Sequence, residues 1–273
     1  MAPTGPRRLL AVDRRHAILE RVAEQQSIHI GEFAAELGVS EMTVRRDIAR
    51  LERDGFLRRT YGGATAHLTR TLELGFNARA LEQPAAKRLI GMRGAELVKD
   101  ATTLFVGIGS TCEQFARFLP SRDDRTVITD SVPLGGLFGT RSGRVVVLGG
   151  EVRRDELSCI GPVAAATVRR YHADVAVLGA AGLSTSVGLT ELFDEEAEIH
   201  RSMIEQSERV VVLADSTKMG ADEHAVVAPV EAIDVLVTDE HIDGAAALEL
   251  RSRGVEVVVA GSDDRRGADS GAA

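Results

Sequence analysis

The sequence contains no tryptophan, and only two tyrosines and eight phenylalanines occur among its 273 residues. Hydrophobic residues nevertheless make up 44% of the chain, so its interior must be an aliphatic core. No apolar run approaches the roughly 20 residues that a membrane helix needs. The first apolar stretch is also too short for a signal peptide. We therefore expect a cytoplasmic protein with no membrane partner.

Cysteine is almost as scarce as the aromatic residues. Cys112 and Cys159 lie far apart in the chain and form neither a CxxC pair nor a metal-ligand spacing. This argues against a zinc site or a redox pair. We expect two small buried side chains in a reducing compartment, no metal site and no cofactor.

Positive charge is lacking overall, since the formal net charge is −8. The first 70 residues nevertheless hold 12 arginines against 9 acidic residues, a formal +3, while the remainder holds 21 basic and 32 acidic residues, a formal −11. An acidic molecule repels polyanions, so a local basic region indicates a dedicated contact surface for one. The length indicates about two domains.

The N-terminal region has the order of a helix-turn-helix. A short helix with Phe33 on its apolar face ends at Gly38, which suits a left-handed C-terminal position. A second helix follows, with Ser40 placed to cap it and Val44, Ile48 and Leu51 forming one apolar stripe. The second helix of such a pair usually enters the major groove of DNA with its N-terminal residues leading.

The outward face of this second helix carries polar and basic side chains. Arginine suits DNA recognition because its planar fork grips guanine, or a phosphate, with two hydrogen bonds at once. Arg58 and Arg59, on the hairpin that follows, are placed to hold the DNA backbone as a wing. The alternative is an exposed charged helix in which arginines form weak ion pairs with Asp47 and Glu52. Glu41 also lies on this face, and the candidate DNA contacts on the helix itself are Met42, Thr43, Arg45, Arg46 and Arg50.

Beyond residue 86 the pattern changes to short β-branched runs that alternate with helical segments. Nearly continuous apolar runs indicate strands buried on both faces, hence a mostly parallel sheet covered by helices. The fold class is therefore α/β overall: an N-terminal winged helix-turn-helix, then a Rossmann-like, mostly parallel α/β domain. The predicted strands lie at 103–107, 125–129, 144–150, 174–182, 209–215, 234–239 and 255–261.

Glycine turns and hydroxyl residues follow several of these strands. Gly107 and Gly109 allow a close backbone approach, and the helix that begins near Ser110 and Thr111 offers its N–H groups to an anion such as phosphate. The alternative is a tight turn whose Ser and Thr only cap the helix. Ligands in open parallel sheets gather beyond the carboxyl ends of the strands. The other candidates at these ends are Asp130, Ser131, Gly149, Gly150, Arg153, Asp215 and Lys218.

The stretch VSEMTVRRDIARLERDGFLRRTYGGA resembles the signature of the DeoR family of bacterial transcriptional regulators, and the likeness covers nearly all of residues 13 to 240. The resemblance implies a winged helix-turn-helix fused to a sugar-phosphate-sensing domain related to ribose-5-phosphate isomerases. It carries Ser40, Thr43, Arg45 and Arg46 over as DNA contacts. From pattern and composition we expect the DNA-binding domain at 9–64, a linker without strong apolar period at 65–85, the effector-sensing domain at 86–260 and a polar, Gly-rich, disordered tail at 261–273.

Three positions depart from the family pattern. Gly107 stands where the family usually has Asp, Asp130 where it has Asn, and His200 where it has Lys. The first change removes an acceptor for sugar hydroxyls, and the second adds negative charge near the expected phosphate. We interpret His200 as a surface residue of its helix.

The function expected from these features is a sequence-specific transcriptional regulator. We expect a repressor of carbohydrate metabolism genes that binds double-stranded operator DNA as a homo-oligomer, a dimer or larger, and is released by a phosphorylated sugar. One alternative is a phosphosugar isomerase that uses Glu191, Asp194 or Asp215 as a base and Lys218 as the cation. Another is an architectural DNA-binding protein that senses no metabolite.

Overall fold

The computed structural model describes residues 14–15, 17–18, 21–22, 27–53, 57–60, 62–65, 79–80, 82–154 and 156–261. The chain divides into two compact units, Met1–Glu82 and Gln83–Ala273. The predicted tail beyond Gly261 and most of the predicted linker lie outside the described residues. Each unit is described by itself below.

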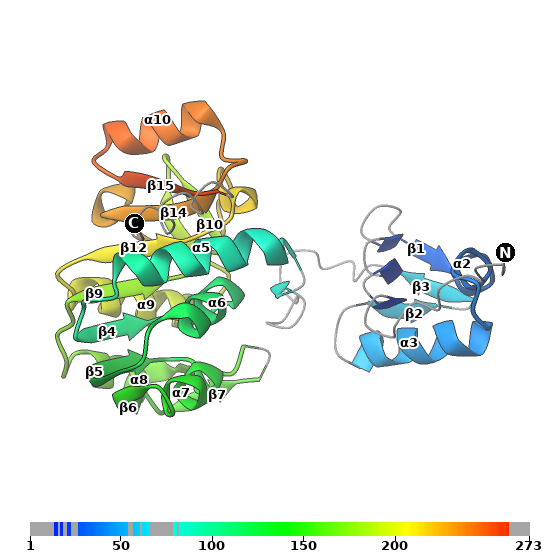
Figure 1. Cartoon of the computed structure of the whole chain (residues 1–273), viewed down its shortest axis with the longest axis horizontal. Helices are drawn as coiled ribbons and strands as arrows, with labels where there is room; N and C mark the ends of the chain where they lie inside the picture. Colours follow the sequence, from blue (N-terminus) through cyan, green and yellow to red (C-terminus); the bar gives the residue numbers. More distant parts are fainter. Residues whose placement is uncertain are drawn as a thin grey trace, which may run out of the picture. The chain divides into compact units, whose positions relative to one another are not determined.

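The N-terminal unit combines two described helices with a small antiparallel sheet (Figure 1). The sheet has the strand order β1-β3-β2. Its core contains Ile18, Phe33 and Leu57 together with residues of the longer helix. The elements are β1 (Ser27–His29), α2 (Ile30–Glu36), α3 (Glu41–Arg53), β2 (Arg58–Thr60) and β3 (Gly63–Thr65).

The turn between α2 and α3 has the predicted geometry. Gly38 has φ +63°, a left-handed conformation that favours glycine. The backbone N–H of Thr43 donates to the Ser40 hydroxyl at 3.2 Å, so Ser40 caps α3. Val44 and Ile48 are fully buried, with Leu51 beside them, which confirms the predicted apolar stripe.

The second unit is built on a seven-stranded parallel sheet with the order β15-β14-β12-β9-β4-β5-β6 (Figure 1). This confirms the predicted α/β class. The strands are β4 (Thr103–Val106), β5 (Arg122–Thr129), β6 (Ser142–Val147), β9 (Val175–Leu178), β12 (Val210–Leu213), β14 (Val235–Asp239) and β15 (Glu256–Ala260).

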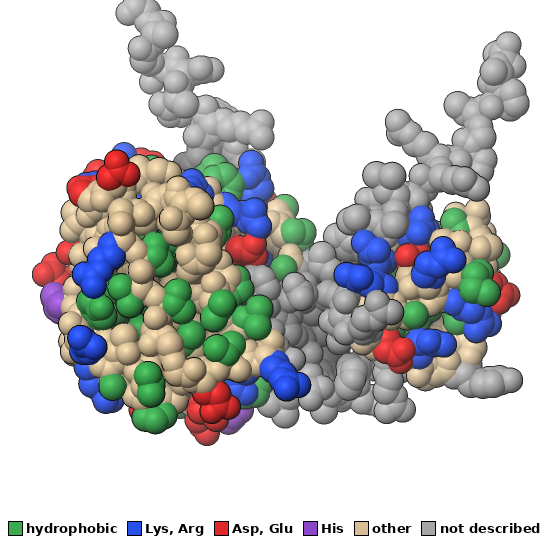
Figure 2. Space-filling model, turned by 90° about the horizontal axis from the view of Figure 1, so that it is seen from below, with side chains coloured by type: hydrophobic (Ala, Val, Ile, Leu, Met, Phe, Trp, Pro, Cys, Tyr) green, Lys and Arg blue, Asp and Glu red, His purple; other side chains and the backbone are tan. Residues whose placement is uncertain are grey.

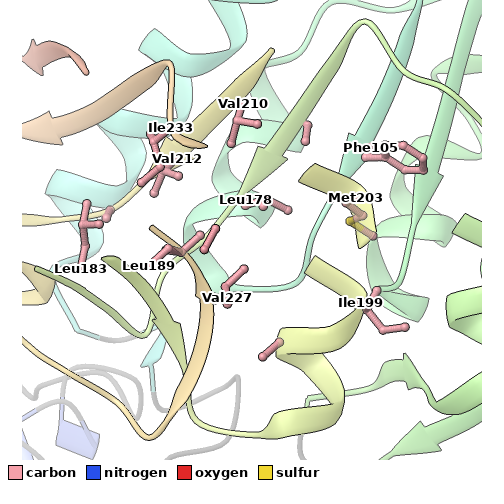
Figure 3. Close-up of a cluster of buried hydrophobic side chains, with 14 of the residues drawn as sticks. Phe105, Leu178, Leu183, Leu189, Ile199, Met203, Val210, Val212, Val227 and Ile233 are labelled. Atoms are coloured by element: carbon pink, nitrogen blue, oxygen red, sulfur yellow. The ribbon is translucent and has the colours of Figure 1, made fainter. Parts of the chain in front are cut away.

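Helices cover both faces of this sheet because successive strand residues point to opposite sides. Leu104 and Val106 face a core built with α5 (Pro84–Leu97), α6 (Ser110–Phe118) and α7 (Val132–Phe138). Phe105, between them, faces the other core, which is drawn in Figure 3. That core is completed by α8 (Gly161–Val168), α9 (Asp194–Glu205) and α10 (Gly244–Ser252). Helix α5 begins at Pro84, so the last two residues of the predicted linker form its first turn.

Short antiparallel strands complete the unit, and the sequence pattern does not reveal them. A hairpin joins β7 (Glu151–Arg153) to β8 (Ser158–Ile160) directly after β6. A separate sheet has the order β10-β11-β13. Its strands are β10 (Gly182–Ser184), β11 (Gly188–Glu191) and β13 (Ala225–Ala228), and two single 3-10 turns are η1 (Ser216–Lys218) and η2 (Val230–Ala232).

Candidate functional site

One exposed face of α3 carries most of the predicted DNA contacts. Met42, Arg45, Arg46 and Arg50 are exposed there, and Thr43 is half-buried. Their outward orientation follows from the burial of Val44, Ile48 and Leu51 on the opposite side of the helix. Figure 2 shows basic side chains interspersed with a few acidic ones on the visible face of this unit. The face therefore presents positive charge on exposed side chains.

The ion pairs of the N-terminal unit fall into two kinds. Arg45 pairs loosely with Glu41 at 3.4 Å in an exposed contact, and Arg59 lies 3.8 Å from Glu52. Asp47 is different, because it is buried and pairs with Arg14 at 2.8 Å. The alternative interpretation, in which Asp47 and Glu52 both form solvated ion pairs, is therefore wrong for Asp47, whereas the Glu52 contact is exposed. Of Arg58 only the backbone is described, so its predicted contact stays a prediction.

The predicted ligand residues of the second unit lie at one edge of its sheet. Gly107 follows β4, Asp130 follows β5, Gly149 follows β6 and Asp215 follows β12. These four strands are parallel, so their carboxyl ends meet at the same edge. The topology thus collects segments that lie over 100 residues apart in the chain.

The glycine turn after β4 leads directly into α6. Gly109 has φ +122° and precedes the first helical residue, and no side chain caps the helix there. Ser110 and Thr111 form the buried start of the helix. They do not take the capping role of the alternative interpretation. An N-terminus without a side-chain cap, flanked by two hydroxyls, suits an anion.

His200 is fully buried, so its interpretation as a surface residue is wrong. Its Nε2 lies 3.3 Å from a carboxylate oxygen of Asp130, and its Nδ1 lies 3.3 Å from one of Glu191. Neither nitrogen has a partner in good hydrogen-bond geometry, so these contacts are ion pairs when the imidazole is protonated. A Cβ at Gly107 would lie 2.9 Å from the imidazole Nε2. The three positions that depart from the family pattern therefore form one contact cluster.

The two carboxylates keep His200 charged. Burial alone would lower the pKa of His200, but contact with Asp130 and Glu191 and their negative charge raise it to about 10. The imidazolium offsets the carboxylate of Asp130, which the sequence suggested would repel a phosphate. Burial raises the pKa of Cys112, and these two carboxylates raise it further, so its thiol stays protonated. Both cysteines are buried and free, as expected.

A second buried cation at this edge is Lys87, which the sequence analysis missed. It lies in the first turn of α5, and its Nζ is 4.0 Å from an Asp215 carboxylate oxygen. Both side chains are almost completely buried. Asp215 also accepts from the backbone N–H and the hydroxyl of Thr217. Lys218 is half-buried in η1, three residues after Asp215 in the chain. No sequence motif marks this lysine, because it meets Asp215 only when the folded chain brings α5 beside the end of β12.

Arg153 lies beside the glycine turn that follows β6. Its guanidinium stacks 3.9 Å above the Phe193 ring, and it contacts Glu195 at 2.8 Å and Glu196 at 3.3 Å. Burial raises the pKa of Glu196 to about 7, although a hydrogen bond from the Ser158 hydroxyl at 2.7 Å opposes this. Gly150, with φ +97°, packs against the backbone of β8, where an added Cβ would clash. This part of the edge is therefore tightly packed and internally paired.

The residues proposed for an isomerase do not converge. Glu191 is held by His200, and Asp215 is held by Lys87 and Thr217. Asp194 is exposed at the start of α9. Among the described residues, no group of His, Cys, Asp or Glu has the arrangement of a metal site. No helix in the described ranges has both the length and the apolar character needed to cross a membrane.

Comparison with known proteins identifies both units. The model of the DeoR-like helix-turn-helix domain matches residues 14–70, and that of the DeoR C terminal sensor domain matches residues 82–240. A putative aga operon transcriptional repressor of Escherichia coli O157:H7 is 29% identical, covering 91% of this chain and 94% of that protein. The transcriptional repressor CsqR of Escherichia coli K12 is 30% identical, with coverages of 92% and 96%. The transcriptional repressor AccR of Agrobacterium fabrum is 31% identical, with coverages of 83% and 89%.

Proposed function

Because the chain belongs to the DeoR family of transcriptional regulators, we propose that it represses carbohydrate metabolism genes until a phosphorylated sugar binds its second unit. It is a DNA-binding regulator and not an enzyme. Its relatives are named as repressors, which supports the direction of control. The observation that carries the proposal is the exposed arginine face of α3 in an otherwise acidic chain.

The DNA contacts proposed for this function are the side chains of the α3 face and the wing. Arg45 and Arg46 would donate to base edges or phosphates, because both side chains are exposed and the contact of Arg45 with Glu41 is long. The Ser40 hydroxyl already caps α3, so we propose that it contacts a phosphate from the helix start rather than a base. Arg50, on α3, and Arg59, on the wing, would contact phosphates of the DNA backbone.

The effector phosphate is proposed to bind at the N-terminus of α6. The backbone N–H groups of the first turn and the hydroxyls of Ser110 and Thr111 would donate to it. Lys87 and Lys218 would supply positive charge from the same edge of the sheet. Because His200 neutralises Asp130, the acidic residue after β5 does not oppose an anion here.

Release of DNA requires that the effector favour one arrangement of the protein over another. Lys87 gives a physical reason for such a preference. A phosphate would compete with Asp215 for its ammonium group, and the lysine belongs to the helix that begins directly after the unit boundary at Glu82. We propose a homodimer or larger assembly, because operators with two-fold symmetry need paired DNA-binding units.

A melting-shift screen of the full-length chain with phosphorylated aldoses and ketoses tests the effector site. The unphosphorylated sugars are the ligand control, and DNA duplexes selected from a random library report release. A true effector at 100 times its dissociation constant adds about 2.7 kcal/mol of stability. We expect Lys218→Ala to lose this shift and the exposed Lys99→Ala, remote in sequence and paired with Glu96, to keep it.

Two outcomes would overturn this proposal. If no phosphosugar shifts the melting temperature or releases the selected duplex, the protein is an architectural DNA-binding protein. If a phosphosugar is converted at a rate that Glu191→Gln abolishes, the chain is an isomerase despite its family. The same preparation serves both measurements, so the outcomes can be compared directly.

A further inference from the structure

Met42 differs in character from its neighbours on the exposed face of α3. It is 64% exposed and is the one large apolar side chain that lies mostly in solvent within the described part of the N-terminal unit. Other apolar residues of α3, such as Val44 and Ile48, are fully buried. A single exposed apolar side chain is common on protein surfaces. Met42, however, lies beside charged side chains on the helix proposed to contact DNA, so its apolar side chain is placed to contact a base.

Met42 lies in the first turn of α3, the part that leads into the major groove in helix-turn-helix proteins. Arg45 and Arg46 follow at i+3 and i+4, so all three side chains share one face of the helix. An apolar group is thus flanked by two guanidinium groups on the same short strip of surface.

The polar groups around Met42 already have partners. The Ser40 and Thr43 hydroxyls lie 2.9 Å apart in a hydrogen bond, and Ser40 also caps the helix. Glu41 holds Arg45 at 3.4 Å. In this first turn, the methionine is therefore the side chain with no polar contact to break before it touches a base.

We propose that Met42 recognises thymine through the C5-methyl group, at a position in each half-site next to the bases or phosphates held by Arg45 and Arg46. Among the four bases, only thymine presents an apolar group in the major groove. A guanidinium or hydroxyl group cannot form a hydrogen bond with a methyl group, whereas a flexible thioether side chain packs against it without losing a hydrogen bond. The inference depends on the proposed DNA-binding role of α3.

Deoxyuridine tests this recognition because it keeps every hydrogen-bonding group of thymine and lacks only the methyl. Duplexes are first selected from a random double-stranded library with the full-length protein. Each thymine of the selected duplex is then replaced singly by deoxyuridine, and the dissociation constant is measured. We expect one thymine per half-site at which the wild type loses about fourfold in affinity, the effect of one buried methyl group.

Met42→Ala should bind the unmodified duplex more weakly and lose the response to deoxyuridine at that thymine alone. Met42→Leu, which keeps the apolar surface, should retain the response. Leu248→Ala in α10 is the matched control, since Leu248 is 68% exposed in the other unit. It should behave as the wild type.

The inference is overturned if no thymine is methyl-dependent in the wild type, or if Met42→Ala keeps the wild-type deoxyuridine profile. Arg46→Ala separates this failure from a failure of the proposed function. If Arg46→Ala abolishes selective binding while methyl removal has no effect, α3 binds DNA and only the role of Met42 falls. If Arg46→Ala also has no effect, the assignment of α3 to DNA falls with it.

Discussion

The two units of the chain use charge in opposite ways. In the N-terminal unit, Arg45 and Arg46 are exposed, and the Glu41 contact to Arg45 is long and solvated. In the second unit, the charged groups that matter are buried against opposite charges, as in His200 with Asp130 and Glu191, and Lys87 with Asp215. The first arrangement leaves charge available to a partner. The second uses charge to hold the fold.

This difference predicts whether a mutation in each unit changes DNA binding or stability. Exposed ion pairs contribute little to stability, so changes on α3 should alter binding and leave the fold intact. A buried ion that loses its partner is costly, so changes in the second unit should alter stability first. Function and stability are therefore separable in one unit and linked in the other.

The largest expected effect comes from Arg45→Ala combined with Arg46→Ala. Two lost guanidinium contacts at about 1 to 3 kcal/mol each correspond to a loss of affinity of at least about 30-fold. Titration of a library-selected duplex by fluorescence anisotropy measures this. The melting temperature should not change. A drop in stability with unchanged DNA affinity would show that these arginines stabilise the fold and do not bind DNA.

The next largest effect is expected for His200→Gln. Removal of the imidazolium leaves Asp130 and Glu191 buried with no cation between them, a loss of about 3 to 5 kcal/mol of unfolding free energy. Urea denaturation measures it. His172→Gln is the control, because this histidine is 63% exposed and its contact with Glu208, at 3.7 Å, is loose and exposed to solvent. Equal losses of unfolding free energy in the two variants would show that the buried ion pair stabilises the fold no more than the exposed one.

The stability supplied by His200 should depend on pH in a defined direction. Its pKa is raised from 6.5 to about 10, so the folded protein holds this proton more tightly than the unfolded chain. The contribution is complete below about pH 6.5 and is lost as the pH rises towards 10. The stability advantage of the wild type over His200→Gln should therefore shrink between pH 7 and 10. A constant difference over this range would mean that His200 is neutral.

The smallest effect is expected for Glu41→Gln. Loss of an exposed i,i+4 pair should cost about 0.3 to 0.5 kcal/mol of stability. DNA affinity should rise severalfold at low salt, because a negative charge is removed and Arg45 is released. Titrations at two salt concentrations check this. Weaker DNA binding would indicate that Glu41 itself contacts a base.

Local sequence patterns predicted the parts of the fold that depend on neighbouring residues. The stripe of Val44, Ile48 and Leu51, the Ser40 cap and the left-handed Gly38 follow from spacing and backbone preference alone. The seven parallel strands follow from their apolar runs. The short strands β7, β8, β10, β11 and β13 do not, because three or four residues are too few to show an apolar run or a period.

The buried ion pairs could not be predicted from local patterns, because they join segments that are far apart in the chain. His200 and Lys87 lie on helices with no motif, and their partners Asp130, Glu191 and Asp215 come from three other segments. A lone histidine or lysine is usually a surface residue. Only the folded arrangement shows that these two are enclosed. Most candidate ligand residues lie at one edge of the sheet, because they follow parallel strands, whereas Arg153 lies in the antiparallel strand β7. Their role in binding an effector stays a prediction.

The missing side chain at Gly107 has a consequence for how this protein can vary. The imidazole of His200 occupies the space into which a Cβ at residue 107 would project, only 2.9 Å from its Nε2. A side chain at residue 107 therefore requires the imidazole to move or to be replaced. We expect the two positions to change together between relatives, with Asp130 following whichever cation replaces the histidine.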